Sequence, residues 1–426
     1  MTLNGDTIFA INRSDSTTTI NSSISGSGKL NKKGEGTMVL ASSNTMSGNF
    51  QMGANSAGDT GGTVVLMNSG ALGTKFVLFE NDGSLELGAD GLTIANGIAV
   101  YNRNDSATLW RTLRLDLAGD TSGEFGGGID IRKNNRFRAD VGDGDTLTLS
   151  GNIRSGAGAG GISKIGNGTL ELTGSNTFKG ALTVDGGKVV LSNTTNTFTN
   201  KIDINAGEVQ LAGSGRLNDQ AIEIASGATF RWSSSALADS GNGWYDGTIT
   251  GDGNFIKDGS SSELLVRGAN SIATIEINQG QLTGGSSASA LGTGSTTIYL
   301  GDTSGSNSAA MSYGGALSGT MTAKANIIVR AGSSGTKTYR KSVGGDITDN
   351  TTITLNDDLN VNPGTSGTLT LGGVISGSGG LAKTNSGTLE LSGNNTFSGD
   401  TNINTGTLNK AGVAEVIGLL NTELLQ

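Results

Sequence analysis

The chain has 426 residues, a formal net charge of −9 and an isoelectric point near 4.7, which argues against a nucleic-acid partner because phosphate binding needs a basic surface. It contains neither cysteine nor histidine, and this excludes disulfides, thiolate nucleophiles, Ser-His-Asp triads and histidine metal sites. No run of residues approaches the roughly 20 apolar positions of a membrane-spanning helix, so we expect no membrane span in this chain.

Glycine is frequent and proline almost absent: the chain has 72 glycines and a single proline, Pro363. Val, Ile and Leu recur in pairs with one residue between them, and Ser, Thr and Asn fill much of the remainder. Alternating apolar residues between Gly-rich turns are typical of short β-strands, whereas disordered chains lack such periodic positions. The composition therefore predicts an ordered all-β protein.

The N-terminal segment differs from the rest of the chain. Residues 1–17 contain Ile8-Phe-Ala-Ile11 but no copy of the repeat described below. A stack of strands needs a cover over its open end, because the terminal strand otherwise exposes unpaired backbone groups. We expect residues 1–17 to form an N-terminal cap or a first, atypical coil, followed by a repetitive body over residues 18–410.

A long unit recurs four times in this body. In each copy an apolar residue precedes a lysine by two positions, an apolar pair follows, and an Asn then opens a triplet such as Asn-Thr-Phe. The copies span Ile24–Gly48, Ile153–Gly180, the more diverged Ile249–Ile272, and Ile375–Gly399. The second and fourth copies predict a buried repeat core of Leu170, Leu172, Phe178, Leu389, Leu391 and Phe397.

Two polar positions of the unit carry expectations of their own. We expect the lysine to point outward, with its stem across the surface. It recurs as Lys32, Lys164, Lys257 and Lys383. The asparagine is a candidate for a turn, where its amide can bond the local backbone. It recurs as Asn44, Asn176, Asn270 and Asn395.

Between Thr169 and Trp232 a shorter period is visible. Three alternating strands and three glycines recur at a constant interval, which is too short for a crossover helix and suits one coil of a parallel solenoid. The positions are Leu182–Val184, Ile202–Ile204 and Ile222–Ile224 for the strands, and Gly187, Gly207 and Gly227 for the glycines. Sharp turns that need a positive φ favour glycine there.

After residue 410 the pattern changes. Residues 411–426 place apolar residues at helical spacing, with Val413, Val416, Ile417 and Leu420 on one face. We expect a short C-terminal helix that either caps the last coil or packs on a partner. In the second case the chain would form a homo-oligomer or a filament through the ends of the rod.

The four-copy unit resembles the passenger-associated transport repeat of bacterial autotransporters. The pattern of that repeat, Gly-x-Φ-x-Lys-x-Gly-x-Gly-Thr-Leu-x-Leu-x-Gly-x-Asn-Thr-Phe-x-Gly, is matched closely at Gly160–Gly180 and at Gly379–Gly399, where Asn385 replaces a glycine. The resemblance implies a right-handed parallel β-helix, and the short period gives its coils about 20 residues each, at the lower end of the range for solenoid repeats. It also implies export to the bacterial outer cell surface, often with an adhesive role.

Polysaccharide cleavage is the catalytic alternative, because parallel β-helices often carry lyases and hydrolases. Such chemistry needs acidic residues grouped with Arg or Lys along one face of the coils. The candidates are Asp130, Asp143, Asp145, Asp357, Asp358, Arg132, Lys133, Arg136 and Arg138. None of them recurs at the coil spacing, so we expect no enzyme activity, no catalytic residue, no cofactor and no obligatory metal.

Aromatic side chains could instead bind sugar rings by stacking. Trp110 and Trp232 adjoin or belong to apolar pairs and are expected to pack. The segments Ser234–Tyr245 and Gly301–Gly319 lack such pairs and are expected to leave the rod as loops, where binding residues often lie. Trp244 and Tyr245 thus form a candidate ligand-binding loop.

The sequence favours a non-enzymatic, extracellular or cell-surface β-solenoid with a structural or adhesive role. Its expected partners are surface glycans or the surface of a host or neighbouring cell. Two alternatives stay open, a filament or surface-layer subunit assembled end to end and a polysaccharide-cleaving β-helix enzyme.

Overall fold

The computed structural model describes residues 1–53, 60–101, 109–156, 158–236, 243–259, 263–314, 317–342 and 344–410. These residues form 44 β-strands and no helix, and the strands pair in parallel, which confirms the predicted all-β parallel solenoid. The described part accordingly holds no helix that could cross a membrane. The chain divides into two compact units, Met1–Gly215 (unit 1) and Arg216–Gln426 (unit 2).

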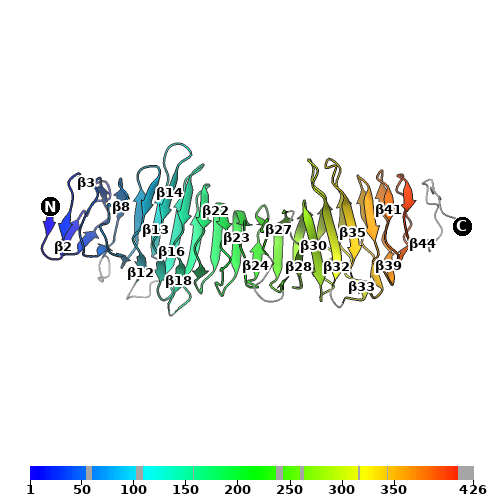
Figure 1. The fold of residues 1–426 in the computed structure, drawn as a ribbon. Helices are drawn as coiled ribbons and strands as arrows, with labels where there is room; N and C mark the ends of the chain where they lie inside the picture. The colour runs from blue at the N-terminus through cyan, green and yellow to red at the C-terminus, as the bar shows by residue number, and fades with distance from the viewer. Residues whose placement is uncertain are drawn as a thin grey trace. The chain divides into compact units, whose positions relative to one another are not determined.

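Unit 1 is built from turns of three strands, and each strand stacks on its counterpart in the turn before (Figure 1). The first stack, the β2 sheet, consists of β2 (Thr7–Ala10), β5 (Leu30–Lys33), β7 (Phe50–Met52), β9 (Val77–Phe79), β12 (Ile98–Val100), β15 (Ile129–Ile131), β18 (Ile153–Ser155) and β21 (Asn176–Thr177). The second consists of β3 (Thr17–Ile20), β6 (Thr37–Leu40), β8 (Thr63–Leu66), β10 (Gly83–Leu87), β13 (Trp110–Leu115), β16 (Arg136–Val141) and β19 (Gly161–Ile165). The third consists of β11 (Leu92–Ile94), β14 (Ser122–Phe125), β17 (Thr146–Leu149) and β20 (Thr169–Leu172). The long strands β22 (Leu182–Leu191) and β23 (Ile202–Leu211) continue the second and third stacks, and β1 (Thr2–Leu3) pairs with β4 (Ser25–Gly26).

Unit 2 has the same plan. Its β26 sheet consists of β26 (Trp244–Tyr245), β28 (Glu263–Val266), β30 (Gly280–Gly285), β32 (Ala309–Gly314), β35 (Lys337–Lys341), β38 (Leu359–Asn362), β41 (Leu381–Lys383) and β43 (Thr401–Ile403). Its β33 sheet consists of β33 (Gly319–Met321), β36 (Ile347–Asp349), β39 (Thr368–Leu371), β42 (Thr388–Leu391) and β44 (Thr407–Lys410). The third stack consists of β25 (Thr229–Trp232), β27 (Ile249–Lys257), β29 (Ser271–Ile277), β31 (Thr297–Leu300), β34 (Asn326–Val329), β37 (Ile353–Leu355) and β40 (Ile375–Gly377). The short strand β24 (Ile222–Ile224) pairs beside it with the first residues of β27.

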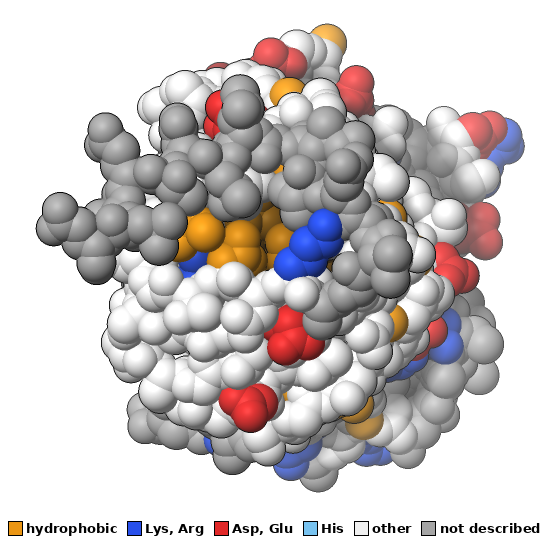
Figure 2. All heavy atoms as spheres, turned by 90° about the vertical axis from the view of Figure 1, so that its right-hand side faces the viewer, with side chains coloured by type: hydrophobic (Ala, Val, Ile, Leu, Met, Phe, Trp, Pro, Cys, Tyr) orange, Lys and Arg blue, Asp and Glu red, His pale blue; other side chains and the backbone are white. Residues whose placement is uncertain are grey.

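Alternation along each strand builds the core. In β20 the residues Leu170 and Leu172 are buried while the residue between them is not, and both leucines stack in register on the turns before and after. All six predicted core residues of the repeat are at most 3% exposed. Seen from the C-terminal end of unit 2, apolar side chains occupy the middle and polar ones the rim (Figure 2). Burial of these rows is the main force that holds a solenoid together.

Turn length varies along unit 1, and outside the repeats many turns are longer than the predicted period. In unit 1 the tightest described turn brings Thr169 into register with Lys188, whereas one of the widest brings Ile98 into register with Ile129. In the repeat region the predicted glycine turns are confirmed, since Gly187, Gly207 and Gly227 all have positive φ, between 63° and 80°. The extra residues in wider turns extend the connections and leave the stacked strands in register.

The lysine of the repeat does not point outward, as we had predicted. All four lysines are fully buried, and each ammonium group donates to backbone carbonyls of tight turns. Lys164 Nζ reaches Ile165 O at 2.8 Å, Gly166 O at 2.7 Å and, in the next turn of the solenoid, Gly186 O at 3.3 Å. Each lysine lies two residues after a buried apolar residue, so strand alternation places it on the inner side. Burial lowers the pKa of Lys32, Lys164 and Lys257 to about 8.

The repeat asparagine links neighbouring turns, whereas we had expected a local turn contact. Asn270 Oδ1 accepts a hydrogen bond of 2.8 Å from the Ile249 N–H, one turn earlier, and its amide donates over 2.6 Å to Ala290 O, one turn later. Asn44 bridges Ile24 and Ala71 in the same way. Asn176 makes both kinds of contact. Its amide donates to Gly174 O in its own turn, as predicted, and to Asn196 Oδ1 in the next turn.

The two ends of the chain were predicted to differ from its repetitive body. The predicted C-terminal helix over residues 411–426 lies outside the described residues. At the N-terminus, β2 already pairs with β5 in parallel, and β1 pairs with β4. The division into residues 1–17, 18–410 and 411–426 stays a prediction.

Candidate binding groove

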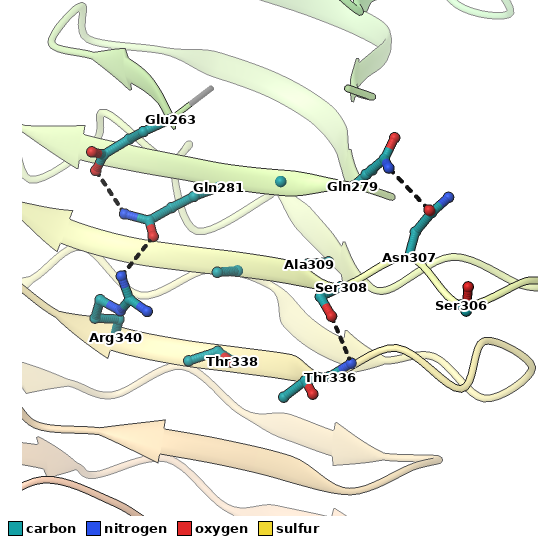
Figure 3. Close-up of a pocket in the computed structure, with 12 residues that line it drawn as sticks. Glu263, Gln279, Gln281, Ser306, Asn307, Ser308, Ala309, Thr336, Thr338 and Arg340 are labelled. Carbon is teal, nitrogen blue, oxygen red and sulfur yellow. Dashed lines mark hydrogen bonds between the residues drawn. The ribbon is translucent and has the colours of Figure 1, made fainter. Parts of the chain in front are cut away.

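The outward side of the β26 sheet in unit 2 carries a row of linked polar side chains (Figure 3). Glu263 lies on β28, Gln281 on β30 and Arg340 on β35. The Gln281 amide donates to Glu263 Oε1 over 2.6 Å, and Arg340 Nη1 donates to Gln281 Oε1 over 2.9 Å. Parallel stacking thus assembles one polar row from three turns that are distant in the sequence.

Small residues beside this row leave an open groove. Ala310 lies in register between Gln281 and Thr338, and its methyl group covers little of the sheet. Gly280 and Ala309 continue this shallow floor along the neighbouring positions. The resulting groove has a volume of about 570 Å³.

A second polar cluster closes the far end of the groove. The Gln279 amide donates to Asn307 Oδ1 over 2.9 Å, and the Thr336 N–H donates to Ser308 Oγ over 3.1 Å. Figure 3 shows these side chains at the strand starts, opposite the Glu263–Arg340 end. The groove therefore presents hydrogen-bonding groups at both ends of a smooth floor.

The lining chemistry suits recognition of a polar ligand. Among the described lining residues Glu263 supplies the one carboxylate and Arg340 the one guanidinium, while the rest are amides, hydroxyls and small side chains. Glycoside hydrolysis generally needs two carboxyl groups on either side of the scissile bond. The groove offers one, together with donors and acceptors that hydroxyl groups can replace.

The repeat of this chain matches a known family model. The model of the passenger-associated transport repeat matches residues 30–72, 162–191, 185–211 and 381–409. These matches fall on the stacked turns in which the buried leucines, lysines and asparagines recur. The chain is a β-solenoid that carries the passenger-associated transport repeat of autotransporters. The predicted resemblance is thereby confirmed, while the diverged copy Ile249–Ile272 lies outside the matched residues.

A curated relative points in the same direction. The chain is 32% identical over 151 residues to "Adhesin BmaC autotransporter" of Brucella suis biovar 1 (strain 1330). The matched region covers 32% of this chain but only 4% of that relative, so the similarity is confined to one segment of a much longer protein. No solved structure matches the chain significantly.

The residues Trp244 and Tyr245, predicted to lie in a loop, form a strand. The two residues form β26, and Tyr245 is fully buried against Trp232, with its hydroxyl donating to Gln220 O. Trp244 is half-buried, and Arg267 lies 5.1 Å from its ring centroid. Gly301–Gly319, also predicted as a loop, contains the whole of β32. Ligand binding at Trp244 stays a prediction.

The other two tryptophans pack, as predicted. Trp232 is 1% exposed within the core of unit 2. Trp110 lies under two arginines of β16, with Arg138 3.9 Å and Arg136 5.2 Å from its ring centroid. Cation–π contacts of this kind explain both arginines without a catalytic role.

The acidic candidates for catalysis make local structural contacts or lie exposed. Asp145 is buried and accepts hydrogen bonds from the Leu117 and Thr121 N–H groups, both at 3.0 Å. Asp357 Oδ2 accepts a hydrogen bond of 2.7 Å from Lys337 Nζ. Burial opposes its ionisation, but this bond and the Asp358 N–H outweigh burial and lower the pKa of the Asp357 carboxyl. Asp358 accepts the Gly380 N–H, and Asp143 is exposed. Among the described residues no three acidic side chains gather where they could hold a metal ion.

Sequence reasoning did not single out the groove residues. Glu263, Gln281 and Arg340 belong to turns of different length, so no fixed period relates them in the sequence. A partial signal existed, because Ser306–Ser308 lies in the Ser/Gly/Asn-rich segment in which we expected binding residues.

Proposed function

We propose that this passenger-type solenoid is a non-enzymatic, adhesive protein of the bacterial outer cell surface, and that it binds polar glycans through the β26-sheet groove. The printed name of the relative, an adhesin, supports the adhesive role, and the repeat family supports the location. Because the chain spans a small part of that relative, its partners are inferred from its own surface.

The observation that carries the proposal is the Glu263–Gln281–Arg340 row. The Glu263–Gln281 and Gln281–Arg340 hydrogen bonds hold the row together in the absence of ligand, while Arg340 Nε is buried without a hydrogen-bond partner among the described residues. Sugar hydroxyls both donate and accept hydrogen bonds, so they can exchange with the paired groups of the row and can also accept from the unpaired Arg340 Nε. Sites on strands are held more precisely than sites on loops.

The test is binding of the purified, labelled chain to a glycan array, followed by adhesion of bacteria that display it. We expect Gln281→Leu and Arg340→Gln to abolish binding to the glycans that the native chain retains. Arg330→Gln is the matched control, because Arg330 makes a similar contact with Glu276 at 2.8 Å on another face of unit 2. Equal loss in the control, or no retained glycan, would contradict the proposal.

The same samples test the catalytic alternative. After prolonged incubation with each bound glycan, reducing ends and unsaturated products are measured. We expect none from the native chain. Product formation that disappears in Glu263→Gln would make the groove an active site and overturn the non-enzymatic part of the proposal.

A further inference from the structure

We propose that the outward face of the β2 sheet in unit 1 holds a second binding groove, for a sugar ring that bears a carboxylate. This groove has a volume of about 490 Å³ and shares no residue with the β26-sheet groove. It goes beyond the proposed function because it selects a different ligand class with a different set of contacts.

The floor of this groove is made of backbone. Gly97 and Gly128 precede β12 and β15 and are neighbours, since the Ile98 N–H donates to Gly128 O over 2.9 Å. Ala99 lies in register with Asp130 and Leu78 on either side and adds a methyl group. A ligand can therefore approach the sheet closely between taller side chains on both sides.

An exposed aromatic ring forms one wall. Phe76 is 57% exposed, although it directly precedes the buried strand β9. Its ring rests on the Gly97 backbone, where a Cβ atom would lie 2.5 Å from the ring carbon Cε1. The glycine thus seats the ring at the groove edge, beside Leu78. Exposed apolar side chains on a rigid surface often mark binding sites. The face of this ring can stack on the apolar C–H face of a pyranose.

A positively charged pair forms the opposite wall. Arg132 Nε lies 3.0 Å from Asp130 Oδ2, and its guanidinium is 5.9 Å from the Tyr101 ring centroid. Arg154 approaches the same carboxylate oxygen only to 3.9 Å, and its side chain is 70% exposed. One carboxylate cannot neutralise two guanidinium groups, so this wall carries a local positive charge in a chain of net charge −9.

The two walls are spaced for a ring and its acidic group. Phe76 precedes β9 and Arg154 lies on β18, three strands away, but the Phe76 ring lies over Gly97 beside β12 and Arg154 reaches Asp130 of β15. Because β12 and β15 are adjacent, the two groups are separated across the strands by about one strand spacing, roughly 5 Å. Guanidinium groups bind carboxylates through paired hydrogen bonds of matching geometry. A sugar acid can therefore stack on Phe76 and turn its carboxylate toward Arg154, while Asp130 holds Arg132, the second cation of this wall, in place.

The test is calorimetric titration of the full chain with two matched pairs of probes. The pairs are tri-galacturonic acid with its methyl ester, and sialyllactose with lactose. We expect at least one acid to bind about tenfold or more tightly than its uncharged counterpart, as the loss of a charged hydrogen bond implies. This preference should shrink at high salt, because the charges are exposed.

Substitutions assign the binding to the two walls. Arg154→Gln should abolish the preference for the acid, whereas Arg13→Gln, which removes another highly exposed arginine of unit 1, should leave it unchanged. Phe76→Ala should weaken binding of both members of a pair, and Phe76→Tyr should retain it. Gly97→Ala should act like Phe76→Ala, because the new methyl group displaces the ring.

Several results would overturn the proposal. These are absence of binding by both acids, equal affinity for acid and uncharged partner, or equal loss in Arg13→Gln and Arg154→Gln. Equal binding of a tri-glutamate peptide would show a general anion site and reject the sugar ring. These variants leave Gln281 and Arg340 intact, so their outcome is independent of the glycan-array experiment.

Discussion

At the scale of the residue, the buried lysines are the most informative feature. Lys32, Lys164 and Lys383 each donate to the two carbonyls that follow them and to a carbonyl of the next turn. An ammonium group has three donors, and three turn carbonyls match them. The lysine therefore ties two successive turns together from inside, a role that a neutral apolar residue cannot take.

We predict that Lys164→Met destabilises the chain. The methionine fills the same space but leaves three turn carbonyls without their donor, at a cost of about 1–3 kcal/mol. Urea unfolding followed by circular dichroism measures it. Lys179→Met, at an exposed position of the same turn, should change the free energy of unfolding by less than about 0.5 kcal/mol. Equal effects of the two substitutions would mean that the buried contacts contribute nothing.

The same lysines predict an unusual dependence of stability on pH. Burial lowers the pKa of Lys32, Lys164 and Lys257 from 10.5 to about 8, so above pH 8 the folded chain releases protons that the unfolded chain still holds. Stability rises with pH wherever the unfolded state binds more protons. We expect the free energy of unfolding to increase from pH 8 toward pH 10 and the increase to be smaller in Lys164→Met.

Above pH 10 the trend should reverse. Burial raises the pKa of Tyr245, Tyr313 and Tyr339 well above 10.0, so in this range the unfolded chain loses protons first and stability falls. Urea titrations at successive pH values measure both limbs. A free energy of unfolding that declines steadily from pH 8 would contradict the assignment of lowered lysine pKa values.

At the scale of the element, alternation predicted the structure better than residue type did. Leu170 and Leu172 were placed inward correctly because apolar residues at every second position must share a face. The lysines followed the same rule, two residues after Ile162 or Leu381, yet were assigned outward because charged residues are rarely buried. Strand alternation determines the inward direction of these lysines, and the turn carbonyls accept the hydrogen bonds that their buried ammonium groups donate.

The structure also shows that the diverged third copy is a full member of the repeat. Lys257 donates to Gly259 O and to Gln279 O of the next turn, and Asn270 bridges two turns. The family model does not match this copy, but its two polar positions have the same partners as elsewhere. The repeat is therefore defined by its inward lysine and asparagine more than by its Gly-Thr-Leu sequence.

We predict that Asn270→Leu and Asn395→Leu cost similar amounts. Each removes a side-chain oxygen that accepts a buried backbone N–H, from Ile249 and Ile375 respectively, both at 2.8 Å. An unpaired buried donor costs about 1–3 kcal/mol. Denaturant titrations compare the two. A neutral Asn270→Leu beside a destabilising Asn395→Leu would show that the third copy has lost the function of its asparagine.

At the scale of the whole molecule, the sequence predicted the solenoid but could not predict its grooves. The constant interval from Leu182 to Ile202 is enough to identify stacked coils, and these two residues do lie in register. The neighbours across a groove depend on every turn length between them, and these lengths differ widely, from the short turn between Glu263 and Gln281 to the long one between Ile98 and Ile129. That Phe76 and Arg154 line the same groove can therefore be recognised only once the register of each turn is known.

This architecture also predicts how damage spreads within unit 1. Each turn contacts mainly its neighbours, so stability is close to a sum of local terms. Leu172→Asp places an unpaired charge between Leu149 and Leu191, which lie in register with it on β17 and β22. We expect hydrogen exchange to accelerate in β17, β20 and β22 but not in β6, several turns away. Glu171→Gln, on the outward side of the same strand, should leave all four strands unchanged. Uniform acceleration from β6 to β22 would instead mean that unit 1 opens as one cooperative block.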